Sequence, residues 1–403
     1  MRQRESKADP YVPQNLMQWD KHIHAFVSLC AEVVPKEGPL AGLTVGVKDV
    51  IDVAGVPTRN GSDACKDAKP ALQDAAVVAA LRNAGARIVG KTTTTEFAFT
   101  DPTPCRNPHD LNRSPGGSSS GSGAAVAAGV VDIALCTQTA GSLCRPAAYC
   151  GAVGFKPSYG MLPSAGVNPL AASFDTVGII ASSVALAKKA FAAIAPAKVS
   201  AAEPSFVGVV TGLWQTDAHV DEDALAGLHS AATALGPHID NAPLSTDVDA
   251  IVKAHRIVMN YEAATAHGSM LQDARVDVLK PKFLAGLKAG LKTSPDEAKQ
   301  AAHFLADAKQ QFWGALAGAE IVLTLPVPEG APLIDGTTGY QDWLTPWTVF
   351  GGPLVCLPWG PDRRGRPRSV MLAAHPGQDA QILATAARLE KCSPDLPRPQ
   401  LPA

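Results

Sequence analysis

Residues 137–146 (TQTAGSLCRP) follow the apolar run 131–136 and surround Ser142 with small residues. A turn of this composition leaves backbone N–H groups free to point at a single oxygen, as an oxyanion hole beside a nucleophile requires. A serine nucleophile also needs a base that accepts its proton. The stretch therefore indicates covalent serine catalysis, and the base has to come from elsewhere in the chain.

The histidines offer no clear base. None belongs to an H-E-x-x-H motif, and His109, beside a serine-rich stretch, is typical of a solvent-exposed turn. Lys48 stands in VGVKD at the end of an apolar run. Burial there would lower its pKa and leave a neutral amine that can accept a proton. The open alternative is an ordinary strand-end lysine that reaches solvent.

The serine-rich stretch 113–129 (RSPGGSSSGSGAAVAAG) has three simple interpretations. A phosphate loop ends in Gly-Lys-Ser/Thr, but no lysine occurs between Lys91 and Lys156. A nucleophile elbow matches formally at 117–121, but it must follow a buried strand, and the preceding DLNRSPG is polar. A linker is disfavoured because the stretch continues into an apolar helix-then-strand pattern. Spacing alone does not decide what chemistry the stretch 113–129 performs.

Composition sets the frame for these residues. The chain has 403 residues, of which 46% are hydrophobic, and a net charge of −2. This length allows one large enzyme domain, so we expect a single domain over 1–403. The charge gives no reason to expect nucleic acid or an anionic membrane surface. No apolar run is long enough to span a bilayer, and the eight cysteines lack a CxxC pair, which favours a reduced, cytoplasmic protein.

Short apolar runs alternate with helical patterns early in the chain, and this alternation predicts an α/β fold with helices covering a sheet. Strands are expected at 43–50, 86–95, 131–138, 205–210, 320–327, 353–358 and 369–374. Helices are expected at 74–86, 221–235, 248–272, 295–317 and 377–391. We therefore predict a helical elaboration over 212–318 that lies near the substrate entrance.

Three segments together resemble the amidase signature family of hydrolases. They are GVKD (46–49), SPGGSSSGSGAAVAAG (114–129) and TQTAGSLCRPAAYCGAVGFKP (137–157). The resemblance is strong over 40–180, which would form the catalytic signature core, and weaker echoes follow at 322–332 and 345–360. It implies a mixed, twisted β-sheet core covered by helices on both faces.

The resemblance also implies a Ser-cisSer-Lys triad. Ser142 would be the nucleophile, Ser118 the bridging serine after a cis Gly117–Ser118 bond, and Lys48 the base. The oxyanion hole would be formed by the backbone N–H groups of Thr139, Ala140, Gly141 and Ser142. Close backbone approach and supporting hydrogen bonds would come from Gly116, Gly117 and Ser119. This mechanism needs no metal and no organic cofactor.

The nucleophile segment departs from the common pattern of the family. Ala140 stands where many members have glycine, and Arg145 is displaced by one residue. The resulting form is similar to malonamidase-like members, in which the arginine at the position of Arg145 binds a substrate carboxylate. A guanidinium fork suits that task. The alternative is that Arg145 pairs with a buried acid or caps carbonyl groups.

We therefore expect a cytoplasmic serine amidohydrolase that cleaves the C–N bond of a small amide, carboxylate-bearing and malonamate-like substrates included, and releases ammonia or an amine. Its expected partner is the small-molecule substrate, without nucleic acid or membrane, and a homodimer stays open.

Two alternatives come from other classes of protein. One is the glutaminase-type subunit of a tRNA-dependent amidotransferase, for which the compact chain leaves little docking surface. The other is a non-catalytic binding protein on an amidase scaffold, disfavoured because binding alone requires none of Lys48, Ser118 and Ser142.

Overall fold

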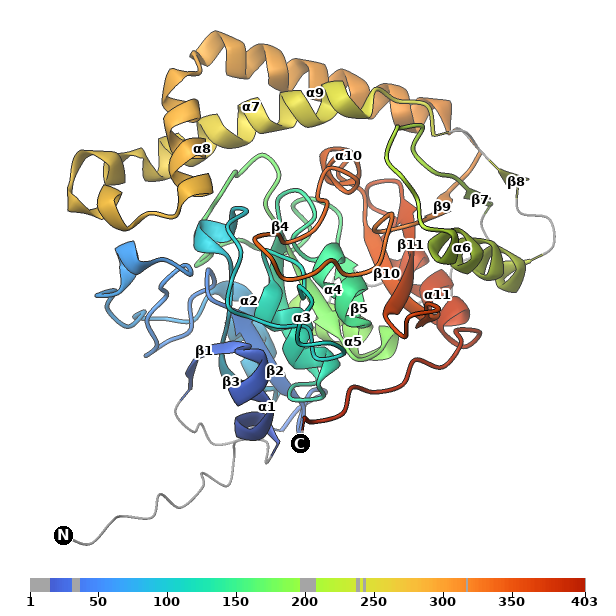
Figure 1. Cartoon of the computed structure of the whole chain (residues 1–403), viewed down its shortest axis with the longest axis horizontal. Coiled ribbons are helices and arrows are strands. Elements are labelled where there is room, and N and C mark those ends of the chain that lie inside the picture. Colours follow the sequence, from blue (N-terminus) through green and yellow to red (C-terminus); the bar gives the residue numbers. More distant parts are fainter. Residues whose placement is uncertain are drawn as a thin grey trace, which may run out of the picture.

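The computed structural model describes residues 15–30, 37–195, 208–236, 240–241, 244–316 and 318–402. These residues form one eleven-stranded sheet with the order β1-β3-β2-β4-β6-β5-β10-β11-β9-β7-β8 (Figure 1). The strands are β1 (Phe26–Leu29), β2 (Thr44–Lys48), β3 (Arg87–Thr92), β4 (Ile133–Gln138), β5 (Val153–Lys156), β6 (Thr176–Ala181), β7 (Val209–Thr211), β8 (Asp240–Asn241), β9 (Ile321–Thr324), β10 (Leu354–Pro361) and β11 (Pro367–Ala374).

The sheet is mixed. Strands β3, β2 and β4 run parallel, the neighbours from β4 to β9 pair antiparallel, and β9, β7 and β8 are parallel again. Residues 205–207 of the expected strand 205–210 lie outside the described part of the chain, and β7 begins at Val209. Every residue of β2 and β4 is buried. Successive side chains of a strand point to opposite faces of the sheet, so a strand whose residues are all buried must be covered on both faces.

Helices supply that cover. Helices α3 (Ser120–Ala127) and α4 (Cys144–Cys150) contact each other, with α3 on β2 to β4 and α4 on β5, β10 and β11. A second group consists of α2 (Ala76–Asn83), α5 (Val184–Ile194) and α11 (Asp379–Glu390). In it, α2 packs on β3, α5 on β4 to β6, and α11 on β10 and β11. The predicted fold class, an α/β fold with a mixed, twisted sheet covered on both faces, is therefore confirmed.

A helical layer lies on one side of the molecule. It consists of α7 (Val248–His267), α8 (Pro281–Lys292) and α9 (Pro295–Ala315), coloured yellow to orange in Figure 1. Both α8 and α9 pack on α7, which also contacts α10 (Thr345–Val349). The short helix α1 (Leu16–Ile23) lies near the N-terminus, and α6 (Glu222–Leu235) packs against β11. The predicted elaboration over 212–318 thus includes elements with different neighbours, and its role at a substrate entrance stays a prediction.

An aromatic cluster joins this layer to the sheet. The rings of Phe312 on α9 and Phe350 stack at 4.2 Å, and Trp214 lies 4.5 Å from Trp347 of α10. The indole N–H of Trp343 donates to the carbonyl of Leu325 at 2.8 Å. Because these rings are buried, they fix α10 and the segment before it as part of the core.

Candidate active site

Lys48 is the last residue of β2 and is fully buried. Its Nζ atom lies 2.6 Å from Oγ of Ser118 and 2.8 Å from Oγ1 of Thr137. Burial lowers the pKa of Lys48 from its ordinary value of 10.5 to about 7, because an ammonium ion loses hydration there, while Cys136 and Asp175 oppose the change. The amine can therefore exist in both protonation states near neutral pH.

Ser118 lies in the serine-rich loop, where the Gly117–Ser118 peptide bond is cis. Gly116 has a φ of +84°, a left-handed conformation that glycine adopts without strain. A Cβ atom on Gly117 would lie only 2.7 Å from Cγ2 of Thr338. The loop is held further by the backbone N–H of Thr95, which donates to the carbonyl of Ser118 at 3.2 Å. Glycines are thus needed for this close packing.

Ser142 lies in the turn between β4 and α4 and is 6% exposed. The backbone N–H of Ser119 donates to the carbonyl of Ser142 at 3.1 Å, so the two serine-containing loops are in contact. Gln138, at the end of β4, accepts hydrogen bonds from the N–H groups of Leu143 and Cys144 through Oε1, at 3.0 and 2.9 Å. The structure brings the loops of Ser118 and Ser142 together beside Lys48.

The turn 139–142 is also held from outside. The hydroxyl of Thr139 donates to the carboxylate of Asp175 at 2.5 Å, and the hydroxyl of Thr348 donates to the carbonyl of Ala140. Burial raises the pKa of Asp175 to about 6, although its hydrogen bonds from Thr139 and from backbone N–H groups favour the ionised form. A turn fixed at this many points keeps its N–H groups in one orientation, which an oxyanion hole requires.

Arg145 lies on α4, just after the turn 139–142, and is 1% exposed. Its guanidinium donates to the carbonyl of Gly117 at 2.6 Å, to the carbonyl of Gly339 at 3.3 Å and to Oγ1 of Thr338 at 3.4 Å. Burial lowers its pKa to about 10, so the group stays charged at neutral pH. The guanidinium therefore caps carbonyl groups of two loops, and its binding of a substrate carboxylate stays a prediction.

A cavity of about 370 Å³ lies beside these loops. It is lined by Phe99, Thr100, Arg256, Met259, Asn260, Lys282, Thr337, Thr338, Gly339, Tyr340, Gln341 and Asp342. In its wall, Arg256 of α7 and Asp342 form an ion pair at 2.7 Å, with 54% and 21% of their side chains exposed. Thr338 links the wall to the loop of Ser118, since it lies against Gly117 and accepts a hydrogen bond from Arg145.

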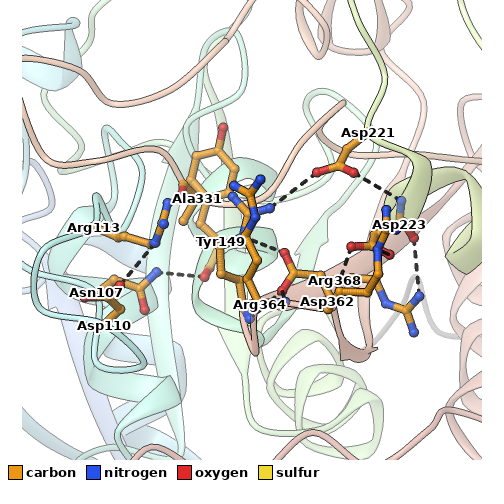
Figure 2. A network of polar contacts seen from close by, with 12 residues as sticks. Asn107, Asp110, Arg113, Tyr149, Asp221, Asp223, Ala331, Asp362, Arg364 and Arg368 are labelled. Atoms are coloured by element: carbon orange, nitrogen blue, oxygen red, sulfur yellow. Dashed lines mark hydrogen bonds and ion pairs between the residues drawn. The ribbon is translucent and has the colours of Figure 1, made fainter.

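Charged side chains hold the chain at Ala331 and at the turn between β10 and β11 (Figure 2). Arg113 donates to the carbonyl of Ala331 at 2.7 Å, and Arg366 pairs with Asp362 and Asp221 at 2.5 and 3.3 Å. The neighbouring Arg363 pairs with Glu222 and Asp223 of α6. Arginines of the basic run 363–368 are therefore engaged by carboxylates within the chain.

Several residues of the site were not assigned from the sequence. Thr137 and Gln138 stand inside the nucleophile motif, so their position was the available signal. Asp175 lies within the strong resemblance over 40–180 and Thr348 within the weaker echo 345–360, but neither was given a role. The cavity pair Arg256 and Asp342 lies in segments with no motif of their own. They reach the site only through the tertiary fold.

Comparisons with known proteins agree with this arrangement. Residues 17–211 match the sequence profile of the Amidase family. A glutamyl-tRNA(Gln) amidotransferase subunit from Methanospirillum hungatei is 44% identical over 182 residues, which is 44% of this chain and 42% of that protein. The subunit of the same name from Saccharolobus solfataricus is 39% identical over 199 residues, 45% and 41% of the two chains. A crystal structure of an amidase superposes with a TM-score of 0.81 at 27% identity, covering 94% of this chain and 95% of the other.

The chain belongs to the amidase signature family. Over nearly its whole length it also has the fold of a solved amidase. The alignments span about four tenths of the curated relatives' length. Among the described residues, no helix is long and apolar enough to cross a membrane.

Two expectations from the sequence are wrong. A free-standing hydrolase of a small, malonamate-like amide does not agree with relatives that are named as amidotransferase subunits. The expectation that the partner is a small amide, without nucleic acid, is wrong for the same reason. The nucleophile motif describes how an amide is cleaved rather than which amide it is. Net charge is a sum over the whole chain, so −2 says nothing about a partner that itself binds nucleic acid.

Proposed function

We propose that this chain is the amide-cleaving component of a glutamyl-tRNA(Gln) amidotransferase, and that it releases ammonia from glutamine for a partner synthase acting on charged tRNA. The observation that carries the proposal is the 44% identity over 182 residues to a subunit of an enzyme of that name. Such a complex would work in the cytoplasm, where tRNA is charged.

The proposed chemistry uses the three residues Lys48, Ser118 and Ser142. The neutral amine of Lys48 accepts a proton from Ser118, 2.6 Å away, and Ser118 accepts the proton of Ser142. The oxygen of Ser142 attacks the side-chain carbonyl of glutamine, and the N–H groups of 139–142 hold the oxyanion. Collapse breaks the C–N bond, and the proton returns through Ser118 to the leaving ammonia. Water then cleaves the glutamyl ester by the same path.

The cavity supports glutamine as the amide. A free α-amino acid carries one carboxylate and one ammonium group, and the cavity wall presents the complementary pair Arg256 and Asp342. These two side chains neutralise each other at 2.7 Å. With glutamine bound, the guanidinium would turn to the α-carboxylate and Asp342 to the α-ammonium group, which leaves the side-chain amide free to reach Ser142.

The decisive experiment measures conversion of Glu-tRNA(Gln) to Gln-tRNA(Gln) by the complex that co-purifies with the tagged chain from its native host. We expect conversion with glutamine as the nitrogen donor. The matched control is the same complex with Ser142→Ala, which should fail with glutamine but convert the tRNA when ammonium chloride supplies the nitrogen.

Rescue by ammonium separates loss of the amidase step from loss of the complex. Conversion by the Ser142→Ala complex with neither glutamine nor ammonium added would show that the nitrogen comes from elsewhere. Absence of any tRNA-modifying partner, together with turnover of other amides in preference to glutamine, would overturn the proposal.

A further inference from the structure

The turn 139–142 is held by its carbonyl groups. In a trans peptide, the C=O of one residue and the N–H of the next share a plane and point in opposite directions. The carbonyl of Thr139 contacts His255, that of Ala140 accepts from Thr348, and that of Gly141 accepts from the N–H of Arg145 at 3.0 Å. Each contact therefore sets the direction of the N–H on the opposite side of its peptide.

His255 contacts this turn from a distant part of the chain. It lies on α7, is 2% exposed, and packs its ring on that of Phe174 at 4.4 Å. Its Nε2 atom lies 2.9 Å from the carbonyl oxygen of Thr139. A carbonyl oxygen only accepts, so Nε2 carries the proton. Burial lowers the pKa of His255 to about 4, so the ring is a neutral donor at neutral pH.

We propose that His255 is a positioning residue for amide cleavage, which holds the carbonyl of Thr139 and thereby directs the N–H of Ala140 into the oxyanion hole. The inference rests on the proposed serine chemistry but not on which amide is cleaved. Helix α7 lies outside the stretch 17–211 that matches the family profile. The assignment comes from the contact itself and not from the family motif.

Helix α7 gives this contact a second consequence. The residue after His255 is Arg256, and Met259 and Asn260 follow one turn later, and these three line the cavity. A ligand that repositions this part of α7 would also move the donor to Thr139. The cavity wall and the oxyanion turn are therefore joined by one rigid element.

The test compares two histidines of the same helix. His255→Leu removes the donor to Thr139, and His255→Gln keeps a side-chain N–H at a similar distance from the backbone. His267→Leu is the control, because His267 is also buried on α7 and its Nε2 lies 2.7 Å from a backbone carbonyl, that of Pro169. His255→Met is a second apolar variant, matched in length to glutamine.

We expect His255→Leu and His255→Met to lower kcat by about 10- to 100-fold with KM nearly unchanged, because an oriented oxyanion donor acts mainly in the transition state. His255→Gln should recover most of this loss. His267→Leu should lower the melting temperature about as much as His255→Leu does, while its kcat stays within about threefold of the parent. Equal kcat values for the two Leu variants, or no recovery in a folded His255→Gln, would overturn the inference.

A second measurement, covalent labelling of Ser142, does not depend on which amide the enzyme cleaves. A fluorophosphonate probe forms a bond between the oxygen of Ser142 and phosphorus as the P–F bond breaks, and the proton of Ser142 passes through Ser118 to Lys48. The negative charge that develops on the phosphoryl oxygen also needs the oxyanion hole. We expect slower labelling of His255→Leu and His255→Met than of His267→Leu, and equal rates would contradict the inference. Labelling of the parent enzyme without turnover of glutamine would reject the proposed function and leave this comparison intact.

Discussion

The Nζ atom of Lys48 lies 2.6 Å from Oγ of Ser118, and both side chains are fully buried. A buried lysine is costly when charged, so its environment favours the neutral amine. Its hydroxyl neighbours are Ser118 and Thr137, and Ser118 is the one through which the proposed chemistry passes the proton. The pair therefore sets the protonation state on which the proposed chemistry depends.

Replacement of Lys48 by methionine should reduce kcat by at least about 1,000-fold, since the shape is kept while the base is lost. Lys156→Met is the matched control. Lys156 is also fully buried, burial lowers its pKa to about 8, and its Nζ donates to the carbonyls of Pro157 and Gly352. The control should lose stability in thermal unfolding but keep turnover. Comparable activity of the two variants would remove Lys48 from the mechanism.

The pH dependence of kcat/KM should follow Lys48. Its folded pKa of about 7 lies below the ordinary 10.5, so the amine is protonated and inactive below pH 7 and neutral above it. We expect kcat/KM to rise about tenfold per pH unit below 7 and to level off above. Asp175 raises the pKa of Lys48 through its charge, so Asp175→Asn should move the midpoint to lower pH. A midpoint that stays fixed or rises would contradict this.

Arg145→Met should lower both kcat and stability, the latter by about 1–3 kcal/mol, because the carbonyl of Gly117 would lose a charged donor. Amides with and without a carboxylate should be affected alike. Arg113→Met is the control, since Arg113 also donates to a backbone carbonyl, that of Ala331. A KM increase confined to carboxylate-bearing amides would instead identify Arg145 as a substrate ligand.

Removal of either member of the cavity ion pair should weaken glutamine binding. We expect Arg256→Met and Asp342→Asn each to raise KM for glutamine by about tenfold or more, with a small effect on kcat. The comparison substrate is a neutral primary amide of similar length, for which KM should be unchanged. Arg275→Met is the control for loss of a surface arginine, because Arg275 pairs with Asp273 away from the cavity lining. Equal effects on both substrates would contradict recognition of the zwitterion.

Much of the fold could be predicted from local patterns. The strands around Lys48 and before Ser142 are apolar runs that end in small or polar residues, and they became β2 and β4. Helix α8 was missed because its glycines, Gly286 and Gly290, weaken the helical signal. Both are explained only by packing, since a Cβ on Gly286 would lie 2.6 Å from Phe99 and one on Gly290 would lie 1.9 Å from the carbonyl oxygen of Asn260.

The site likewise contains residues that the sequence predicts and residues that it does not. The resemblance assigned the residues of the two loops because the motif is continuous along the chain. His255 is one of two histidines on α7, and Asp175 is one acid in a loop, so neither pattern predicts a contact with Thr139. Burial and partners of such residues are properties of the folded chain. The proposed recognition of glutamine could not be predicted from the sequence for the same reason, since Arg256 and Asp342 meet only after folding.

The two carbonyl groups capped by Arg145 belong to different parts of the enzyme. Gly117 precedes Ser118, whereas Gly339 lies in the cavity wall. An exchange of the wall segment between relatives, as in the engineering of a new substrate range, would therefore also move an acceptor of a buried charge. Specificity and turnover in this scaffold should be redesigned together, with residues 337–342 and Arg145 treated as one unit.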